Sequence, residues 1–181
     1  MFPSHDQAGG ANDPSSTNSL DVVESWNGSS WTEVAEINTG RAHLGSRAAG
    51  TQTAGLIFGG VNTYPGTNQL AVTESWNGSA WTEVSDLNTA RAGLAGSGSS
   101  TAALASAGAA PPSSNVGNVE SWNGSSWTET TDVNTSRRFL GGSGTSTSTL
   151  IFGGSSPNKT ETESWDGSAW LIVTGKHFLH Y

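Results

Sequence analysis

One tryptophan-containing segment occurs four times in the chain, and this repetition constrains the fold more than any other feature. The copies are residues 24–34 (ESWNGSSWTEV), 74–84 (ESWNGSAWTEV), 120–130 (ESWNGSSWTET) and 163–173 (ESWDGSAWLIV). They begin 50, 46 and 43 residues apart, a period typical of proteins built from repeated supersecondary units. All eight tryptophans of the chain lie in these copies: Trp26, Trp31, Trp76, Trp81, Trp122, Trp127, Trp165 and Trp170.

Each copy is predicted to form a β-hairpin. A β-favouring segment, such as residues 22–26 (VVESW), precedes an Asn-Gly or Asp-Gly pair, which tolerates positive φ angles and marks tight turns. The chain then returns through a second β-favouring segment, such as residues 31–34 (WTEV). A four-residue loop places the two tryptophans opposite each other, and such a pair adds about 0.5–1.5 kcal/mol beyond the area it buries. We therefore expect the tryptophans to form the structural core of the hairpins.

Two further strand-like segments precede each later hairpin. A small-residue segment is followed by an apolar run that ends in a glycine pair, as in residues 56–60 (LIFGG) and 150–154 (LIFGG). The corresponding run at residues 104–108 (LASAG) has the thinnest apolar fill, so we expect its blade to be the least stable. Four short strands in each repeat are typical of one blade of a β-propeller.

The glycine pair, the tryptophan after the turn and the arginine before the next inner strand together resemble the kelch repeat. The resemblance covers nearly the whole chain, and the ESWNG-type hairpins are similar to those of repeat proteins from bacteriophages and environmental bacteria. It implies an all-β fold, namely a small β-propeller of four kelch-like, four-stranded antiparallel blades. The chain departs from the kelch pattern where tryptophan replaces the usual tyrosine of each hairpin and where Ala107 interrupts a glycine pair.

The two ends of the chain are predicted to share one blade. Residues 174–179 (TGKHFL) are similar to residues 39–44 (TGRAHL), so the C-terminal segment would begin a new inner strand. We expect residues 178–181 to pair with residues near the N-terminus, which would close the ring and remove an exposed sheet edge. The expected organisation is one domain, 1–181, with blades at about 42–87, 92–133 and 138–173 and a split blade formed by 1–37 with 176–181.

Composition argues against several classes of partner and site. The chain has seven Lys plus Arg residues and a net charge of −8, whereas a nucleic-acid-binding protein needs a basic surface, so we expect no nucleic-acid partner. It has neither an apolar run of about 18 residues nor a signal-peptide pattern, so membrane insertion is not expected. Cysteine is absent, and only His177 and His180 have a spacing suited to metal ligands, so neither a metal nor another cofactor is predicted.

No catalytic residue is predicted, and we expect that the protein is not an enzyme. The recurring carboxylates occupy four similar positions, whereas a catalytic acid needs an environment of its own. We expect these carboxylates to be structural and to bind backbone amides or linker arginines. A resemblance to a kelch-type copper oxidase would imply a Cys–Tyr pair, and the chain has no cysteine. The recurring carboxylates are Glu24, Glu74, Glu120 and Glu163.

The linker arginines and the loops after the glycine pairs form the predicted ligand face. Chain direction in a blade places both on the same side, where guanidinium groups can bind carboxylates or phosphates with two hydrogen bonds. The alternative is that each arginine ties neighbouring blades through a salt bridge or backbone carbonyls. The loops are residues 11–19, 61–70, 109–117 and 155–161. The candidate ligand-contacting residues are Asn12, Asp13, Arg41, Asn62, Tyr64, Arg91 and Arg137.

The leading functional hypothesis is a non-catalytic binding module, because binding residues usually lie on loops held by a rigid scaffold. The phage resemblance implies a virion-associated protein, such as a tail or capsid appendage, at the virion or extracellular surface. Its partner would be a protein or a glycan on a host or virion surface. The alternative is a purely structural decoration or fibre subunit that assembles through its end blades, and a homo-oligomer is compatible with both hypotheses.

Overall fold

The computed structural model describes residues 5–11, 19–45, 49–62, 68–155 and 158–173 of the chain, with residues 5–11 described by their backbone. These residues form seventeen β-strands and no helix, which confirms the predicted all-β class. Accordingly, the described ranges contain no helix that is long and apolar enough to cross a membrane.

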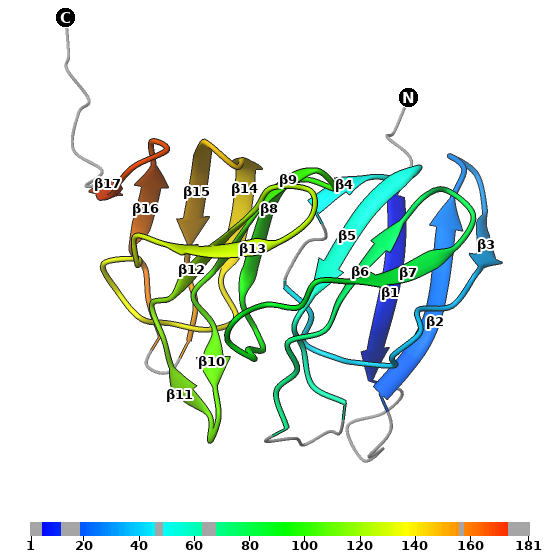
Figure 1. Cartoon of the computed structure of the whole chain (residues 1–181), viewed down its shortest axis with the longest axis horizontal. Coiled ribbons are helices and arrows are strands. Elements are labelled where there is room, and N and C mark those ends of the chain that lie inside the picture. The colour runs from blue at the N-terminus through cyan, green and yellow to red at the C-terminus, as the bar shows by residue number, and fades with distance from the viewer. Residues whose placement is uncertain (1–4, 12–18, 46–48, 63–67, 156–157, 174–181) are drawn as a thin grey trace, which may run out of the picture.

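The strands form four antiparallel sheets that lie side by side, with a short two-stranded ribbon beside the third (Figure 1). Sheet 1 contains β1 (His5–Ala11), β2 (Ser19–Trp26) and β3 (Trp31–Val34). Sheet 2 contains β4 (Ala49–Thr51), β5 (Ala54–Phe58), β6 (Thr73–Trp76) and β7 (Trp81–Val84). Sheet 3 contains β8 (Ala95–Ser99), β9 (Ala102–Ser106), β12 (Val119–Trp122) and β13 (Trp127–Thr130). Sheet 4 contains β14 (Gly141–Thr145), β15 (Ser148–Phe152), β16 (Thr162–Trp165) and β17 (Trp170–Val173), and the ribbon contains β10 (Ala109–Ala110) and β11 (Ser114–Asn115).

The four predicted hairpins are present, and local turn chemistry explains why each copy folds this way. In the third copy the side-chain oxygen of Asn123 accepts hydrogen bonds from the backbone N–H groups of Ser125 and Ser126, at 2.9 and 3.0 Å. Gly124 follows with a φ of 96°, a conformation that glycine adopts without steric cost. The two tryptophans of each hairpin are therefore direct cross-strand partners, and their ring centroids lie 5.2–5.5 Å apart.

The core consists of three interfaces between neighbouring sheets, and each interface has two unlike sides. One side is the tryptophan face of a sheet, and the other is the opposite face of the preceding sheet. Between sheets 2 and 3, for example, Leu56 and Phe58 pack against the hairpin of Trp122 and Trp127. The Phe58 and Trp127 rings meet edge to face, with centroids 4.9 Å apart. The same arrangement places Trp165 and Trp170 against Leu104.

The described strands form three complete four-stranded sheets but do not form a closed ring. Sheet 1 has three described strands, and no other sheet of the described residues covers the outward faces of sheets 1 and 4. Trp31 in sheet 1 is 47% exposed and Phe152 in sheet 4 is 43% exposed. The predicted pairing of residues 178–181 with the N-terminus, and residues 176–181 of the split blade, lie outside the described residues.

Candidate functional site

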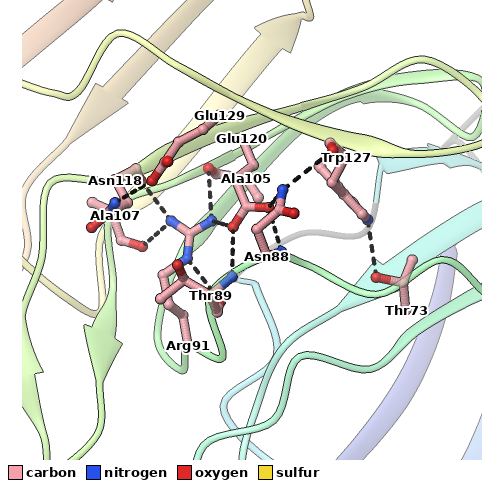
Figure 2. A network of polar contacts seen from close by, with 10 residues as sticks. All are labelled: Thr73, Asn88, Thr89, Arg91, Ala105, Ala107, Asn118, Glu120, Trp127 and Glu129. Atoms are coloured by element: carbon pink, nitrogen blue, oxygen red, sulfur yellow. Dashed lines mark hydrogen bonds and ion pairs between the residues drawn. The ribbon is translucent and has the colours of Figure 1, made fainter.

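Each of the three linker arginines is fully buried and bound to the carboxylate of the following hairpin. In Figure 2, Arg91 Nη2 donates to Glu120 Oε1 at 2.9 Å, and Arg91 Nη1 donates to the carbonyl oxygen of Ala107 at 2.9 Å. The second carboxylate oxygen of Glu120 accepts from the backbone N–H and the side-chain amide of Asn88, at 2.7 and 2.8 Å. Thr89 N–H also donates to Glu120 Oε1, at 3.3 Å, so the carboxylate holds the entire linker.

The other two networks repeat this geometry. Arg41 pairs with Glu74 at 3.0 Å, and Arg137 pairs with Glu163 at 2.9 Å. Burial lowers the pKa of Arg41 and of Arg91 from the ordinary value, and the neighbouring glutamates act in the opposite direction. A buried guanidinium that is already paired cannot also bind an external ligand. The prediction of Arg41, Arg91 and Arg137 as ligand-contacting residues is therefore wrong.

The alternative interpretation of these residues is confirmed. The arginines make salt bridges and bind backbone carbonyls, and three of the four recurring carboxylates bind a linker arginine together with backbone amides. Each linker leaves one sheet and is held by the next, so the network attaches successive sheets to each other. Glu24 differs from the other three because it is exposed and has no arginine partner within the described residues.

The linkers do lie beside the segments that follow the glycine pairs, as predicted from chain direction. Ala42 forms an antiparallel bridge with Val61, and Ala92 forms the same bridge with Ala109. Asn62, a predicted ligand-contacting residue, is exposed and accepts a hydrogen bond from the side-chain amide of Asn68 at 2.9 Å. The predicted residues Asn12, Asp13 and Tyr64 lie outside the described residues.

A second set of linker residues, which the sequence patterns did not single out, connects the sheets on this side. His43, Gly93 and Phe139 each lie two residues after a linker arginine and have left-handed φ angles of 53°, 61° and 54°. The Gly93 N–H donates to the His43 carbonyl at 2.9 Å, and the Phe139 N–H donates to the Gly93 carbonyl at 2.7 Å. The three linkers therefore converge, and the side chains of His43 and Phe139 meet edge to face at 5.1 Å.

Arg138 lies where these linkers meet the loops. Its guanidinium carbon is 5.5 Å from the centre of the Phe139 ring, and its Nη1 donates to the carbonyl oxygen of Ser113 at 3.3 Å. The Ser113 hydroxyl accepts a hydrogen bond from Gln69 Nε2 at 3.2 Å. Two of the predicted loops, 61–70 and 109–117, are thereby joined to one linker. We refer to Gln69, Ser113, Arg138, Phe139 and His43 as the linker–loop site.

The polar groups of the linker–loop site are not all satisfied. Arg138 Nε and Gln69 Oε1 are buried atoms without a hydrogen-bond partner. Arg138 also has no carboxylate partner within the described part of the chain, in contrast to Arg41, Arg91 and Arg137. Phe139 is 50% exposed. The site therefore combines a half-buried cation and an accessible aromatic ring with two buried polar atoms that lack a hydrogen-bond partner.

The electrostatics of His43 reflect its place in this site. Burial lowers the pKa of the imidazole, and the positive charge of Arg138 lowers it further. The ring is therefore neutral near pH 7, and Arg138 carries the positive charge of the site. The described residues contain no group of three or more His, Asp or Glu side chains that could hold a metal ion.

The position of Arg138 directly after Arg137 is the one sequence signal that could have revealed the site. The other linkers have alanine there, at Ala42 and Ala92, so Arg138 is a departure from the repeat. Comparison of the chain with protein-family models and with curated proteins gives no match.

Proposed function

We propose that the protein is a non-catalytic binding module whose linker–loop site takes a carboxylate-bearing glycan. The observation that carries this proposal is Arg138, a cation that has no acidic partner among the described residues, in a chain of net charge −8. An unneutralised guanidinium that lies against loops is suited to bind a carboxylate, because its planar donors match the two carboxylate oxygens.

The groups around Arg138 favour a sugar as the carrier of that carboxylate. Phe139 offers a half-exposed ring on which the apolar face of a pyranose can pack. An aromatic surface with a small number of convergent polar groups is the usual composition of a small-ligand site.

A binding role is favoured over catalysis by the composition of the site. The linker–loop site contains one titratable base, His43, and no carboxylate to act with it. The recurring glutamates Glu74, Glu120 and Glu163 are fully buried and bind the linker arginines, so their role is structural. The hairpins resemble those of phage repeat proteins, and on this basis we extend the proposal to a virion-associated protein that contacts glycans of a host surface.

The test is calorimetric titration of the full chain with an oligogalacturonate and with the same oligosaccharide after its carboxyl groups have been reduced. We expect binding of the acidic sugar and a loss of affinity for the reduced one. Arg138→Gln should weaken binding of the acidic sugar by about ten- to a hundredfold, the usual range for one hydrogen bond to a charged group. Phe139→Ala should weaken binding of both sugars.

Lys159→Gln is the matched control because it removes an equal charge from a loop outside the linker–loop site. We expect this variant to bind as the wild-type chain does. Equal affinity for the acidic and the reduced sugar, or equal losses in Arg138→Gln and Lys159→Gln, would contradict the proposal.

A further inference from the structure

The internal interfaces of the chain define what each face of a sheet packs against. Leu56 and Phe58 of β5 are 0% and 2% exposed because the tryptophan hairpin of sheet 3 covers them. In turn, this contact leaves Trp127 only 6% exposed. The apolar face of one sheet and the tryptophan face of the next are therefore complementary surfaces.

Sheet 4 ends in an apolar face that lacks this partner. Leu150 and Phe152 of β15 occupy the positions of Leu56 and Phe58 in the same LIFGG run and in the same register with the following strand. They are nevertheless 45% and 43% exposed, since no described sheet follows. A face built for packing is therefore open to solvent.

The last hairpin enlarges this open surface. Its outer strand has the sequence WLIV, whereas the corresponding strands of the first two hairpins have WTEV. In β17, Leu171 pairs with Ser164 and Val173 pairs with Thr162, which places both on the same face as Leu150 and Phe152. Leu171 is 59% exposed and Val173 is 48% exposed. Ser164 and Thr162 of β16 lie between the two pairs, so the apolar side chains stand on the two flanking strands of this face. An exposed face with several large apolar side chains marks an interaction site.

In sheet 1 the exposed surface is instead the tryptophan face. Trp31 is 47% exposed, although Trp127 and Trp170, at the same position of their hairpins, are 6% and 5% exposed. Glu24, on the same face, is exposed, whereas its counterpart Glu120 is fully buried. Sheet 1 thus presents a tryptophan face on which no sheet of the described residues packs.

We propose that two copies of this chain associate head to tail, with the Leu150–Phe152 face of one packed on the Trp31 hairpin of the other. Each open face is the partner that the other lacks, by the same contact that joins sheets 2 and 3. Sheets 1 and 4 lie at opposite ends of the row of sheets in Figure 1, so the partner missing from each open face is supplied by another copy of the chain. The contact uses unlike surfaces and therefore produces either a closed ring or a filament.

The first measurement is the mass of the full chain by light scattering across a concentration series. We expect a mass that rises above the 18.6 kDa of one chain as the concentration increases. Phe152→Asp changes the Leu150–Phe152 face, which we call the tail, and Trp31→Arg changes the Trp31 hairpin, which we call the head. Each variant should remain at the mass of one chain. Ile172→Asp is the matched control, because Ile172 is 50% exposed but pairs with Glu163 and therefore lies on the other face of sheet 4, and it should associate as the wild type does.

Mixing the two variants provides a sharper test. The mixture retains one intact head and one intact tail, so it should form a species of two chains, whereas either variant alone should not. Circular dichroism verifies that each variant is folded, and Leu150→Asp replaces Phe152→Asp if the latter is not. Because the chain has no cysteine, Phe152→Cys and Trp31→Cys chains can also be mixed, and they should form a mixed disulfide under oxidation.

A wild-type mass that stays at one chain at all concentrations would overturn the proposal, as would association that survives both variants. Failure of the mixed variants to form the two-chain species would also overturn it, because one complete interface remains available in that mixture.

Discussion

Glu120 and Glu24 occupy the same position of the same repeated motif, yet their environments differ completely. Glu120 is fully buried and binds Arg91, Asn88 and Thr89, whereas Glu24 is exposed and has no arginine partner within the described residues. The local sequence is identical from Glu-Ser-Trp through the turn. An interior sheet and an end sheet thus differ in what packs against them, and the role of each motif residue follows from its neighbours.

The largest expected effect comes from removing the carboxylate charge in the two environments. Glu120→Gln leaves the Arg91 guanidinium buried without its counter-charge, so we expect a loss of about 3–5 kcal/mol in the free energy of unfolding. Glu24→Gln should change it by less than about 0.5 kcal/mol, as is usual for an exposed site. Urea denaturation followed by tryptophan fluorescence measures both values. Similar losses in the two variants would show that burial and pairing of the glutamate do not distinguish the interior sheet from the end sheet.

The glycine pairs allow a more selective comparison of packing. Gly59 and Gly153 have the same place in LIFGG and nearly the same φ, 68° and 67°. A Cβ on Gly59 would lie 2.5 Å from the Arg91 carbonyl oxygen and 2.9 Å from Leu94 Cδ2, whereas a Cβ on Gly153 would meet nothing within 4 Å.

Alanine at either glycine carries the cost of the left-handed conformation, about 1–2 kcal/mol. Gly59→Ala adds a clash with Arg91 and Leu94 in the linker that leads into sheet 3, so it should lose about 1–3 kcal/mol more than Gly153→Ala. The difference between the two unfolding free energies isolates the contribution of this linker. Equal losses would indicate that the linker moves away from Gly59 without cost.

The smallest expected effect concerns the last hairpin, where Asp166 replaces the asparagine of the other copies. Hydrogen bonds from the backbone N–H of Ala169 and from Ser168 lower the pKa of the Asp166 carboxyl below its ordinary value of 3.8. A lowered folded-state pKa means that ionised Asp166 stabilises the fold above the unfolded pKa, and that this stabilisation disappears as the pH falls through the folded pKa.

Asp166→Asn should therefore remove a small acid-dependent loss of stability below the ordinary pKa of 3.8 and have little effect at pH 7. Thermal unfolding of both chains from pH 7 down to pH 2 measures the difference. Asn123→Asp is the reciprocal change in an interior hairpin, and it should introduce the same acid dependence there.

Much of the local structure was predictable from the sequence. The Asn-Gly turns and the alternation of residues 22–26 and 31–34 predicted the hairpins, because turn chemistry and side-chain alternation act over a few residues. The pairing of recurring glutamates with linker arginines was also predicted as an alternative. The ligand role of Arg41, Arg91 and Arg137 was predicted wrongly, because burial of a side chain depends on segments about 30 residues away.

The sequence by itself determined that this chain forms four tryptophan hairpins, and that each interior linker carries an arginine matched to a carboxylate. Tertiary structure decided which copies are enclosed. It buries Arg137 and leaves the adjacent Arg138 beside the loops, and it covers Phe58 while exposing the equivalent Phe152. The physical reason is that strand and turn formation depend on neighbours along the chain, whereas burial depends on whether another sheet packs on the same face.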